Sequence, residues 1–326
     1  MSKRILLTLG ASALAVAAVS VSQPVSAETT LRAASCFPIG SPPSRAFEQL
    51  VKDINAAGKG TVQINLVGGA PAIGNFLTIT QKMSRGAYDL VGCTEAYIGN
   101  VLPEAPVLRL TPKSMAELRS NGGMDYISKL LAEKNIYYLA RHQDFGPFHL
   151  WLSKKIDKPD LTGLNLRVAP VYTAFFKSLG ATVQNAPLPK IYTLMENNTV
   201  QGYGWPGAAW VPPWAKVTKY RVDPGFYTSP LHTLFNLKKW ESLDDKSRTI
   251  LTSISAEHEK NAEPGNARLK AQLAKENAMR AKAGMEIITF TGADRKKWLD
   301  AAYGAAWQEV FDRSPKHGKA LEKLFR

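Results

Sequence analysis

The sequence predicts an α/β protein made of two lobes, because strands and helices alternate in two separate runs. The first run, residues 31–93, alternates short apolar strands such as TVQINLV with amphipathic helices such as PPSRAFEQLVKDINAAG. The second run begins at Leu164 and ends near Trp214, where a cluster of prolines breaks any regular element. Since strands joined through helices pair in parallel, each run is expected to form a sheet with helices on both faces.

The segments between and after these runs connect the lobes. Residues 114–135 are typical of helices, and residues 136–155 of a strand, a crossing segment and a second strand. Residues 221–243 are interpreted as a return strand toward the first lobe. We therefore expect the chain to cross between the lobes more than once, leaving a ligand cleft that closes about a hinge.

The last third of the chain is mainly helical. Residues 244–284 form a long, nearly continuous helical pattern, in which Pro264 either kinks the helix or starts a second one. A late strand, MEIITF, precedes the final helices. The expected limits are a signal peptide at 1–27, lobe I at 28–146 plus about 236–275, and lobe II at 147–235 plus about 276–326.

The first residues have the pattern of a secretory signal peptide. Lys3 and Arg4 precede an apolar run from Ile5 to about Val21, and a small-x-small site ends at Ala27. We expect cleavage after Ala27 and export of the remainder. Removal of the two basic residues lowers the formal net charge from +14 to +12. Acidic residues are scattered among the basic ones, which favours solvated helix faces over a nucleic-acid groove.

The two cysteines, Cys36 and Cys93, each end a strand-like run. In a parallel sheet these ends could be neighbours at the ligand-facing edge, and an oxidising compartment permits a disulfide between them. The alternative is a pair of small buried hydrophobes. Two isolated cysteines and scattered histidines lack the spacing of zinc ligands, so no metal site is predicted.

Known catalytic motifs are missing from the sequence. It contains no G-x-S-x-G elbow, no H-E-x-x-H and no Walker A loop. The histidines do not cluster with a nucleophile in a known spacing; they are His142, His149, His232, His258 and His317. We therefore predict neither an enzyme nor a bound cofactor.

The sharpest candidate for a ligand contact is Arg167, in the apolar strand LNLRV. A buried arginine needs an anionic partner, because desolvation of an unpaired charge is costly. A guanidinium matches a carboxylate through two parallel hydrogen bonds. The alternative is a structural ion pair with an acid such as Asp160.

Several linked motifs resemble one transport family. DLTGLNLRV, FFKSLGATV and PLPKIYTLMENNTVQGYGWP are similar to the signature of TRAP-transporter periplasmic solute-binding proteins, the DctP family, and NLKKWESLDDKSRTIL resembles the segment that follows. The resemblance implies a type II-like periplasmic binding protein fold, with a long connecting helix and a cleft between the lobes. It implies a periplasmic monomer that captures a small organic anion for a permease with small and large membrane subunits.

The resemblance places Arg167 on the residue that clamps the ligand carboxylate. Two departures shape the expected ligand. Phe148 stands where many members carry a second cation, and Trp205 stands where a ligand-contacting Asn is common. We therefore expect a monocarboxylate with an aromatic or bulky apolar body. Alternatives are a dicarboxylate, a sugar acid, or an exported α/β enzyme that uses His142 or His149 as its base.

Further candidate ligand contacts are less specific, and each has packing as its alternative. Arg141 is the best substitute for the missing second cation. The remaining candidates are Asn75, Thr94, Cys36, His142, Gln143, Tyr203, Trp210 and Asn236.

Overall fold

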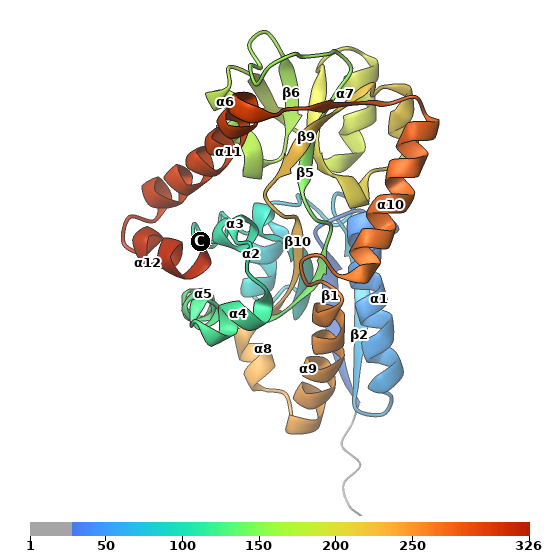
Figure 1. Ribbon diagram of the computed structural model, residues 1–326. Coiled ribbons are helices and arrows are strands. Elements are labelled where there is room, and N and C mark those ends of the chain that lie inside the picture. Colours follow the sequence, from blue (N-terminus) through green and yellow to red (C-terminus); the bar gives the residue numbers. More distant parts are fainter. Residues whose placement is uncertain (1–27) are drawn as a thin grey trace, which may run out of the picture.

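The computed structural model describes residues 28–326, which fold into two lobes around separate sheets (Figure 1). The predicted signal peptide lies outside the described residues. The strands are β1 (Thr29–Ser35), β2 (Val62–Gly69), β3 (Leu90–Thr94), β4 (Ile136–Asp144), β5 (Phe148–Leu152), β6 (Asn165–Val168), β7 (Thr182–Asn185), β8 (Gly202–Pro206), β9 (Tyr220–Phe226), β10 (Pro230–Asn236) and β11 (Glu286–Thr289).

Helices cover both sheets and link the lobes. They are α1 (Pro42–Ala57), α2 (Ile79–Ser84), α3 (Val107–Leu110), α4 (Met115–Ser120), α5 (Gly123–Ala132), α6 (Thr173–Ser178), α7 (Ile191–Glu196), α8 (Leu237–Glu241), α9 (Asp245–Lys260), α10 (Ala267–Lys282), α11 (Gly292–Arg313) and α12 (Gly318–Phe325). The prediction of an α/β fold with two sheets is confirmed.

Lobe I is built on the sheet β2-β1-β3-β10-β4. Strands β2, β1 and β3 are parallel, as their alternation with helices predicts, whereas β10 runs antiparallel to β3 and β4. Helix α1 buries Phe47, Leu50 and Ile54, which recur every three or four residues and so lie on one helix face. Helix α9 packs beside α1 and against β4.

Lobe II is built on the sheet β11-β9-β5-β8-β6-β7. Strands β6, β7 and β8 are parallel, and β5 joins β8 to β9 through antiparallel pairs. Helix α11 packs against α6 and β9 of this lobe, and α10 packs against the turn that follows β8. Ala169, which follows β6, and Pro206, at the end of β8, share a cavity with Phe37 and Thr94 of lobe I, so the carboxyl ends of these strands face lobe I.

The chain crosses between the lobes at four points (Figure 1). The two central crossings are short irregular segments, residues 145–147 between β4 and β5 and residues 227–229 between β9 and β10. The other two are the links between α9 and α10 and between α11 and α12. We call the two short central segments the hinge strands.

The structure corrects the expected limits of the lobes. The return segment is two strands, because the hinge strand at 227–229 separates β9 in lobe II from β10 in lobe I. Lobe I therefore resumes near 230 rather than 236. The predicted long helix is broken around Pro264 into α9 and α10, and α10 already packs on lobe II. The final helix α12 packs on α3 and α5 of lobe I rather than on lobe II.

Candidate functional site

A small cavity of about 40 Å³ lies between the two lobes and the hinge strands. We call it the cleft cavity. Its walls come from both lobes, so separation of the lobes would widen it. Side chains that line the cavity from lobe I include Phe37, Thr94 and Tyr97, and those from lobe II include Phe148, Tyr172 and Trp205.

Lobe I contributes the carboxyl ends of β1 and β3. Cys36 and Cys93 are joined there by a disulfide, and both are buried. Thr94 follows directly; its hydroxyl donates a hydrogen bond to Glu95 at 2.7 Å and caps the turn Glu95–Tyr97. Burial raises the pKa of Tyr97 well above its usual range, so its phenol faces the cavity as a neutral donor.

Lobe II contributes Arg167, whose side chain is completely buried on β6. Its Nε donates to the Ala186 carbonyl at 2.8 Å, Nη2 donates to the same oxygen, and Nη1 donates to the Tyr172 hydroxyl at 3.2 Å. Among residues 28–326 these hydrogen-bond partners are all neutral. Asp160, the alternative partner, instead lies 3.8 Å from Lys158. The Arg167 guanidinium therefore has no carboxylate hydrogen-bond partner within the described chain.

Tyr172 links the arginine to the neighbouring strand. Its hydroxyl donates to the Gly204 carbonyl of β8 at 2.6 Å while accepting from Arg167. A β-carbon at position 204 would lie 2.4 Å from the Tyr172 ring, so only glycine allows the ring to cross this strand. The glycines of the GYGWP motif thus serve close packing around the arginine.

Two aromatic side chains complete the wall. The Trp205 ring centroid lies 5.9 Å from the Arg167 guanidinium carbon, within the range of a cation–π contact. Its indole donates to the Ala209 carbonyl at 2.7 Å, which fixes the ring. Phe148, at the start of β5, packs edge-on against Tyr172 with centroids 5.4 Å apart. The wall beside Arg167 is therefore aromatic.

A buried carboxylate and a buried guanidinium, those of Glu95 and Arg109, lie next to each other in lobe I. Glu95 is fully buried, 4.0 Å from the Arg109 guanidinium of α3. Burial raises the pKa of Glu95 to about 7, and the charge of Arg109 opposes this rise. The Arg109 Nη2 donates to the carbonyl of Val171, which lines the cleft cavity, at 3.0 Å. Sequence reasoning missed both residues, because nothing in VLRL marks its arginine as buried.

Of the predicted ligand contacts, the structure brings Thr94, Phe148 and Trp205 to the cleft cavity, with Arg167 directly behind the Trp205 ring. Cys36 lines a smaller void of about 10 Å³ nearby, which also borders Tyr97. Asn75 is exposed, and its side-chain oxygen accepts from the Leu77 backbone N–H at 2.9 Å. Asn75 therefore caps its own turn rather than lining the cavity.

Three predicted contacts lie elsewhere in lobe I. His142 contacts Phe47 of α1, and burial lowers the pKa of this imidazole to about 3. The Gln143 amide is buried and donates to the Asp144 carbonyl. Asn236 caps α8 at the end of β10 opposite to the cavity. Antiparallel β10 places Leu231, not Asn236, at the edge that lines the cleft cavity, so Asn236 lies away from that cavity.

Tyr203 and Trp210 belong to the core of lobe II. The Trp210 indole donates to the Tyr203 hydroxyl at 3.0 Å, and the same hydroxyl lies 2.9 Å from that of Thr218. Trp210 also stacks on Trp151, with centroids 5.7 Å apart. Arg141, the suggested second cation, is buried beside α9, where its backbone N–H donates to Glu259. Tyr203, Trp210 and Arg141 do not line the cleft cavity.

Several wall residues were not predicted. Tyr172, Tyr97 and Phe145 line the cavity, and each comes from a loop or a short turn rather than from a strand. Pro170 directs the turn that carries Tyr172 under Gly204, and this proline was the available signal. Within residues 28–326 no group of His, Cys, Asp or Glu could hold a metal ion, and no helix is long and apolar enough to cross a membrane.

Comparison with curated proteins gives two partial matches. The chain is 30% identical over 172 residues to the 2,3-diketo-L-gulonate-binding periplasmic protein YiaO of Escherichia coli, covering 50% of this chain and 49% of the relative. It is 25% identical over 152 residues to the monocarboxylate 2-oxoacid-binding periplasmic protein all3028 of Nostoc, covering 44% and 40%. The matches thus span half or less of each relative's length.

Solved structures match over nearly the whole chain. A TRAP periplasmic solute-binding protein from Desulfovibrio salexigens with bound orotic acid has a TM-score of 0.78 at 19% identity, covering 91% of this chain and 97% of its own. A Bordetella pertussis extracytoplasmic solute receptor binding pyroglutamic acid has a TM-score of 0.77 at 15% identity, covering 91% and 99%. At these identities the likeness shows the fold.

The family model for bacterial extracellular solute-binding proteins, family 7, matches residues 34–314. This range includes both sheets, the hinge strands and every wall residue of the cleft cavity. The chain therefore belongs to the family 7 bacterial extracellular solute-binding proteins, the DctP family.

Proposed function

We propose that this protein is the periplasmic receptor of a TRAP transporter and captures a small monocarboxylate with a ring or another bulky apolar body. It then delivers this anion to a permease with small and large membrane subunits. The buried Arg167 guanidinium, hydrogen-bonded to neutral oxygens within the described chain, is the observation that carries the proposal. A ligand carboxylate would compensate its charge through bidentate hydrogen bonds.

The walls of the cleft cavity favour an apolar ligand body. Phe148, Tyr172 and Trp205 offer ring faces and edges, whereas the polar side chains from lobe I and the hinge are Thr94, Tyr97 and Ser229. A sugar acid carries several hydroxyls that need buried partners, since an unpaired polar group is costly to bury. A ring acid needs fewer partners and gains from stacking.

The relatives support the same ligand class in part. Orotic acid and pyroglutamic acid, which two of the similar structures contain, are ring monocarboxylates. Other similar structures contain sugar acids such as D-glucuronate, and these define the second candidate class. A sugar acid would have to recruit polar groups that lie outside the walls described above.

In the proposed cycle the open lobes admit the anion, Arg167 anchors its carboxylate, and the lobes close about the hinge strands. Phe148 and Trp205 then cover the apolar body. The two lobes would move as separate bodies, since the short segments 145–147 and 227–229 join their central strands. The role is capture and release, without a chemical step.

A thermal-shift screen of residues 28–326 tests this proposal. The panel contains orotate, pyroglutamate, a 2-oxoacid, D-glucuronate and short dicarboxylates. A ligand at a hundredfold excess over its Kd stabilises the native state by about 2.7 kcal/mol, which raises Tm by about 5 °C. We expect ring monocarboxylates to give this shift, and Arg167→Ala to abolish it while the exposed control Arg295→Ala retains it. Stabilisation by dicarboxylates or sugar acids alone would overturn the assigned ligand class.

A further inference from the structure

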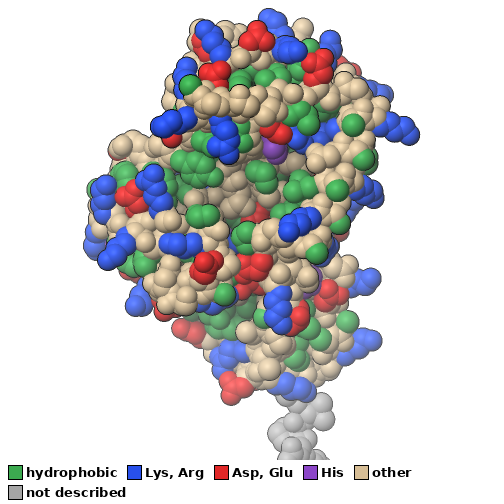
Figure 2. All heavy atoms as spheres, viewed as in Figure 1, with side chains coloured by type: hydrophobic (Ala, Val, Ile, Leu, Met, Phe, Trp, Pro, Cys, Tyr) green, Lys and Arg blue, Asp and Glu red, His purple; other side chains and the backbone are tan. Residues whose placement is uncertain are grey.

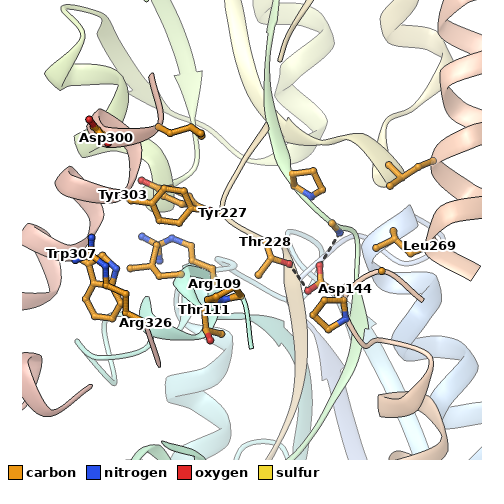
Figure 3. A pocket seen from close by; sticks show the side chains of 18 of the residues that line it. Arg109, Thr111, Asp144, Tyr227, Thr228, Leu269, Asp300, Tyr303, Trp307 and Arg326 are labelled. Atoms are coloured by element: carbon orange, nitrogen blue, oxygen red, sulfur yellow. Dashed lines mark hydrogen bonds between the residues drawn. The ribbon is translucent and has the colours of Figure 1, made fainter. Parts of the chain in front are cut away.

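A second hollow, larger than the cleft cavity, lies elsewhere in the described chain. It has a volume of about 750 Å³ and lies between α10 and α11, on the face shown in Figure 2. We call it the hinge hollow. Figure 3 shows Leu269 on one side of it, Tyr303 and Trp307 on the other, and the hinge strands between them. Its walls therefore come from both lobes and from the hinge.

The hinge strands separate this hollow from the cleft cavity. Asp144 and Gly146 line the hinge hollow, whereas Phe145 between them lines the cleft cavity. Likewise, Thr228 lines the hinge hollow and Ser229 lines the cleft cavity. The hinge hollow is thus a second space, on the opposite side of the hinge from Arg167.

The hollow has apolar walls. Leu269 and Leu273 project from α10, and Leu299, Tyr303 and Trp307 project from α11. Trp307 lines the hollow although its side chain is almost fully buried. Gly304 faces open space, since no atom lies within 4 Å of a β-carbon built there. A flat or branched apolar group would therefore find contact surface on two sides.

The charged groups of the hollow favour an anion. Arg109 is 1% exposed and packs 5.3 Å from the Tyr227 ring centroid. Its Nε has no hydrogen-bond partner among residues 28–326, and its nearest carboxylates lie 3.9 and 4.0 Å away. Lys270 adds positive charge at the hollow's edge, whereas Arg326 there is paired with Glu322 at 2.8 Å. A buried cation with such long ion pairs is under-compensated.

The carboxylates in the hollow are already engaged. Asp144 accepts hydrogen bonds from the Thr228 hydroxyl, which Figure 3 shows, and from the backbone N–H groups of Gly146 and Ser229. Asp300 is paired with the exposed Lys296 at 2.5 Å. Neither acid is among the carboxylates within 4.0 Å of the Arg109 guanidinium, which are Glu95 and Glu309.

From these contacts we propose that the hinge hollow is a second ligand site, which takes a small amphipathic anion. The apolar body lies between the leucines of α10 and the aromatic residues of α11. The anionic group lies toward Arg109. This site is separate from the cleft cavity and does not depend on which solute the cleft captures.

A fluorescent probe of this chemical class tests the site. Anilinonaphthalene sulfonate combines an aromatic body with one anionic group, and its emission rises in an apolar environment. We expect residues 28–326 to bind it saturably, at one probe per chain in the hinge hollow. Gly304→Trp places an indole in the open space and should weaken probe binding by about tenfold or more. Gly304→Ala also replaces the helical glycine but does not fill the hollow, and should bind as the parent does.

A second pair of variants tests the preference for an anion. Leu299→Glu and Leu299→Gln have nearly the same size but differ by one negative charge on the wall. Repulsion should weaken probe binding about fivefold in the Glu variant relative to the Gln variant, and added salt should narrow this difference.

The outcomes are unambiguous. Arg167→Ala should bind the probe with unchanged affinity, which separates this site from the cleft and from the proposed function. Equal probe affinity in Gly304→Trp and Gly304→Ala would overturn the site. Equal affinity in the two Leu299 variants at low salt would overturn the anionic ligand class. Unchanged Tm values in the absence of the probe establish that each variant is folded.

Discussion

Arg109 joins the two lobes, because its Nη2 donates a hydrogen bond to the Val171 carbonyl at 3.0 Å. Arg109 lies on α3 of lobe I, and Val171 lies in the turn that follows β6 of lobe II. The same arginine lines the hinge hollow, whereas Val171 lines the cleft cavity. The bond can form only when the lobes are close together.

Arg109→Lys should therefore favour separated lobes. Lysine retains the positive charge near Glu95 but lacks the planar fork that reaches Val171. A hydrogen bond from a charged group contributes about 1.5–3 kcal/mol, so we expect at least a fivefold loss of affinity for the best acid of the screen, measured by calorimetry. Arg119→Lys is the control, since Arg119 pairs with Glu259 of the same lobe. Equal affinities in both variants would contradict the proposed role.

The contact between Tyr172 and Arg167 predicts a stability effect. Tyr172→Phe removes the hydroxyl that donates to Gly204 and accepts from Arg167. The variant leaves a buried carbonyl and a guanidinium N–H without this partner, which costs about 1–3 kcal/mol. Urea unfolding without ligand should show this loss. An unchanged free energy of unfolding would mean that water replaces the phenol.

The sequence was sufficient to predict the strand that carries Arg167, because a charge within an apolar strand is a local signal. It was not sufficient to predict Tyr172, since the turn after Pro170 brings this ring under Gly204 through geometry that no periodicity encodes. The position of Asn236 could not be predicted, because a strand pattern does not reveal the direction of the strand. Since β10 is antiparallel to β3, its amino end rather than its carboxyl end lies at the cleft cavity.

The ionic groups were the hardest to place from sequence. Arg109 and Arg141 are each 1% exposed. The residues that flank them in the sequence are equally compatible with a solvent-exposed arginine. Their burial follows from the packing of α3 between the lobes and of α9 against β4. Tertiary contacts between distant segments therefore determine which cations are buried, whereas local composition does not.

Glu95 should make stability depend on pH. Burial raises its pKa from 4.5 to about 7 in the folded chain. Its contribution is therefore complete below about pH 4.5 and is lost as the pH rises through 7, by about 3 kcal/mol in total. Urea unfolding from pH 4.5 to 8 should show that Glu95→Gln, which cannot ionise, is less sensitive to pH than the parent by this amount. Parallel pH profiles for the two chains would contradict this assignment.

The disulfide should contribute substantially to stability. Cys36 and Cys93 are separated by 57 residues, and the chain-entropy model gives about 4 kcal/mol for closing a loop of this length. We expect the double variant Cys36→Ala, Cys93→Ala to lose about this much free energy of unfolding. A reductant should destabilise the parent to a similar level and leave the double variant unchanged. A parent chain that is equally stable with and without reductant would contradict the prediction.

Phe148 should determine which class of acid the cleft accepts. Phe148→Arg places a second guanidinium at the cleft cavity, where it could bind a second carboxylate, and removes the ring that packs on Tyr172. Without a dicarboxylate the variant should have a lower Tm than the parent, because an unpaired cation is then partly buried.

With a short dicarboxylate present, we expect Phe148→Arg to gain about tenfold or more in affinity, and its binding of ring monocarboxylates to weaken. Phe148→Leu is the matched control: it loses the aromatic contact without gaining charge, so it should weaken ring acids and gain nothing for dicarboxylates. If the two variants showed the same selectivity in calorimetric titrations, the ring at position 148 would not be what excludes a second carboxylate.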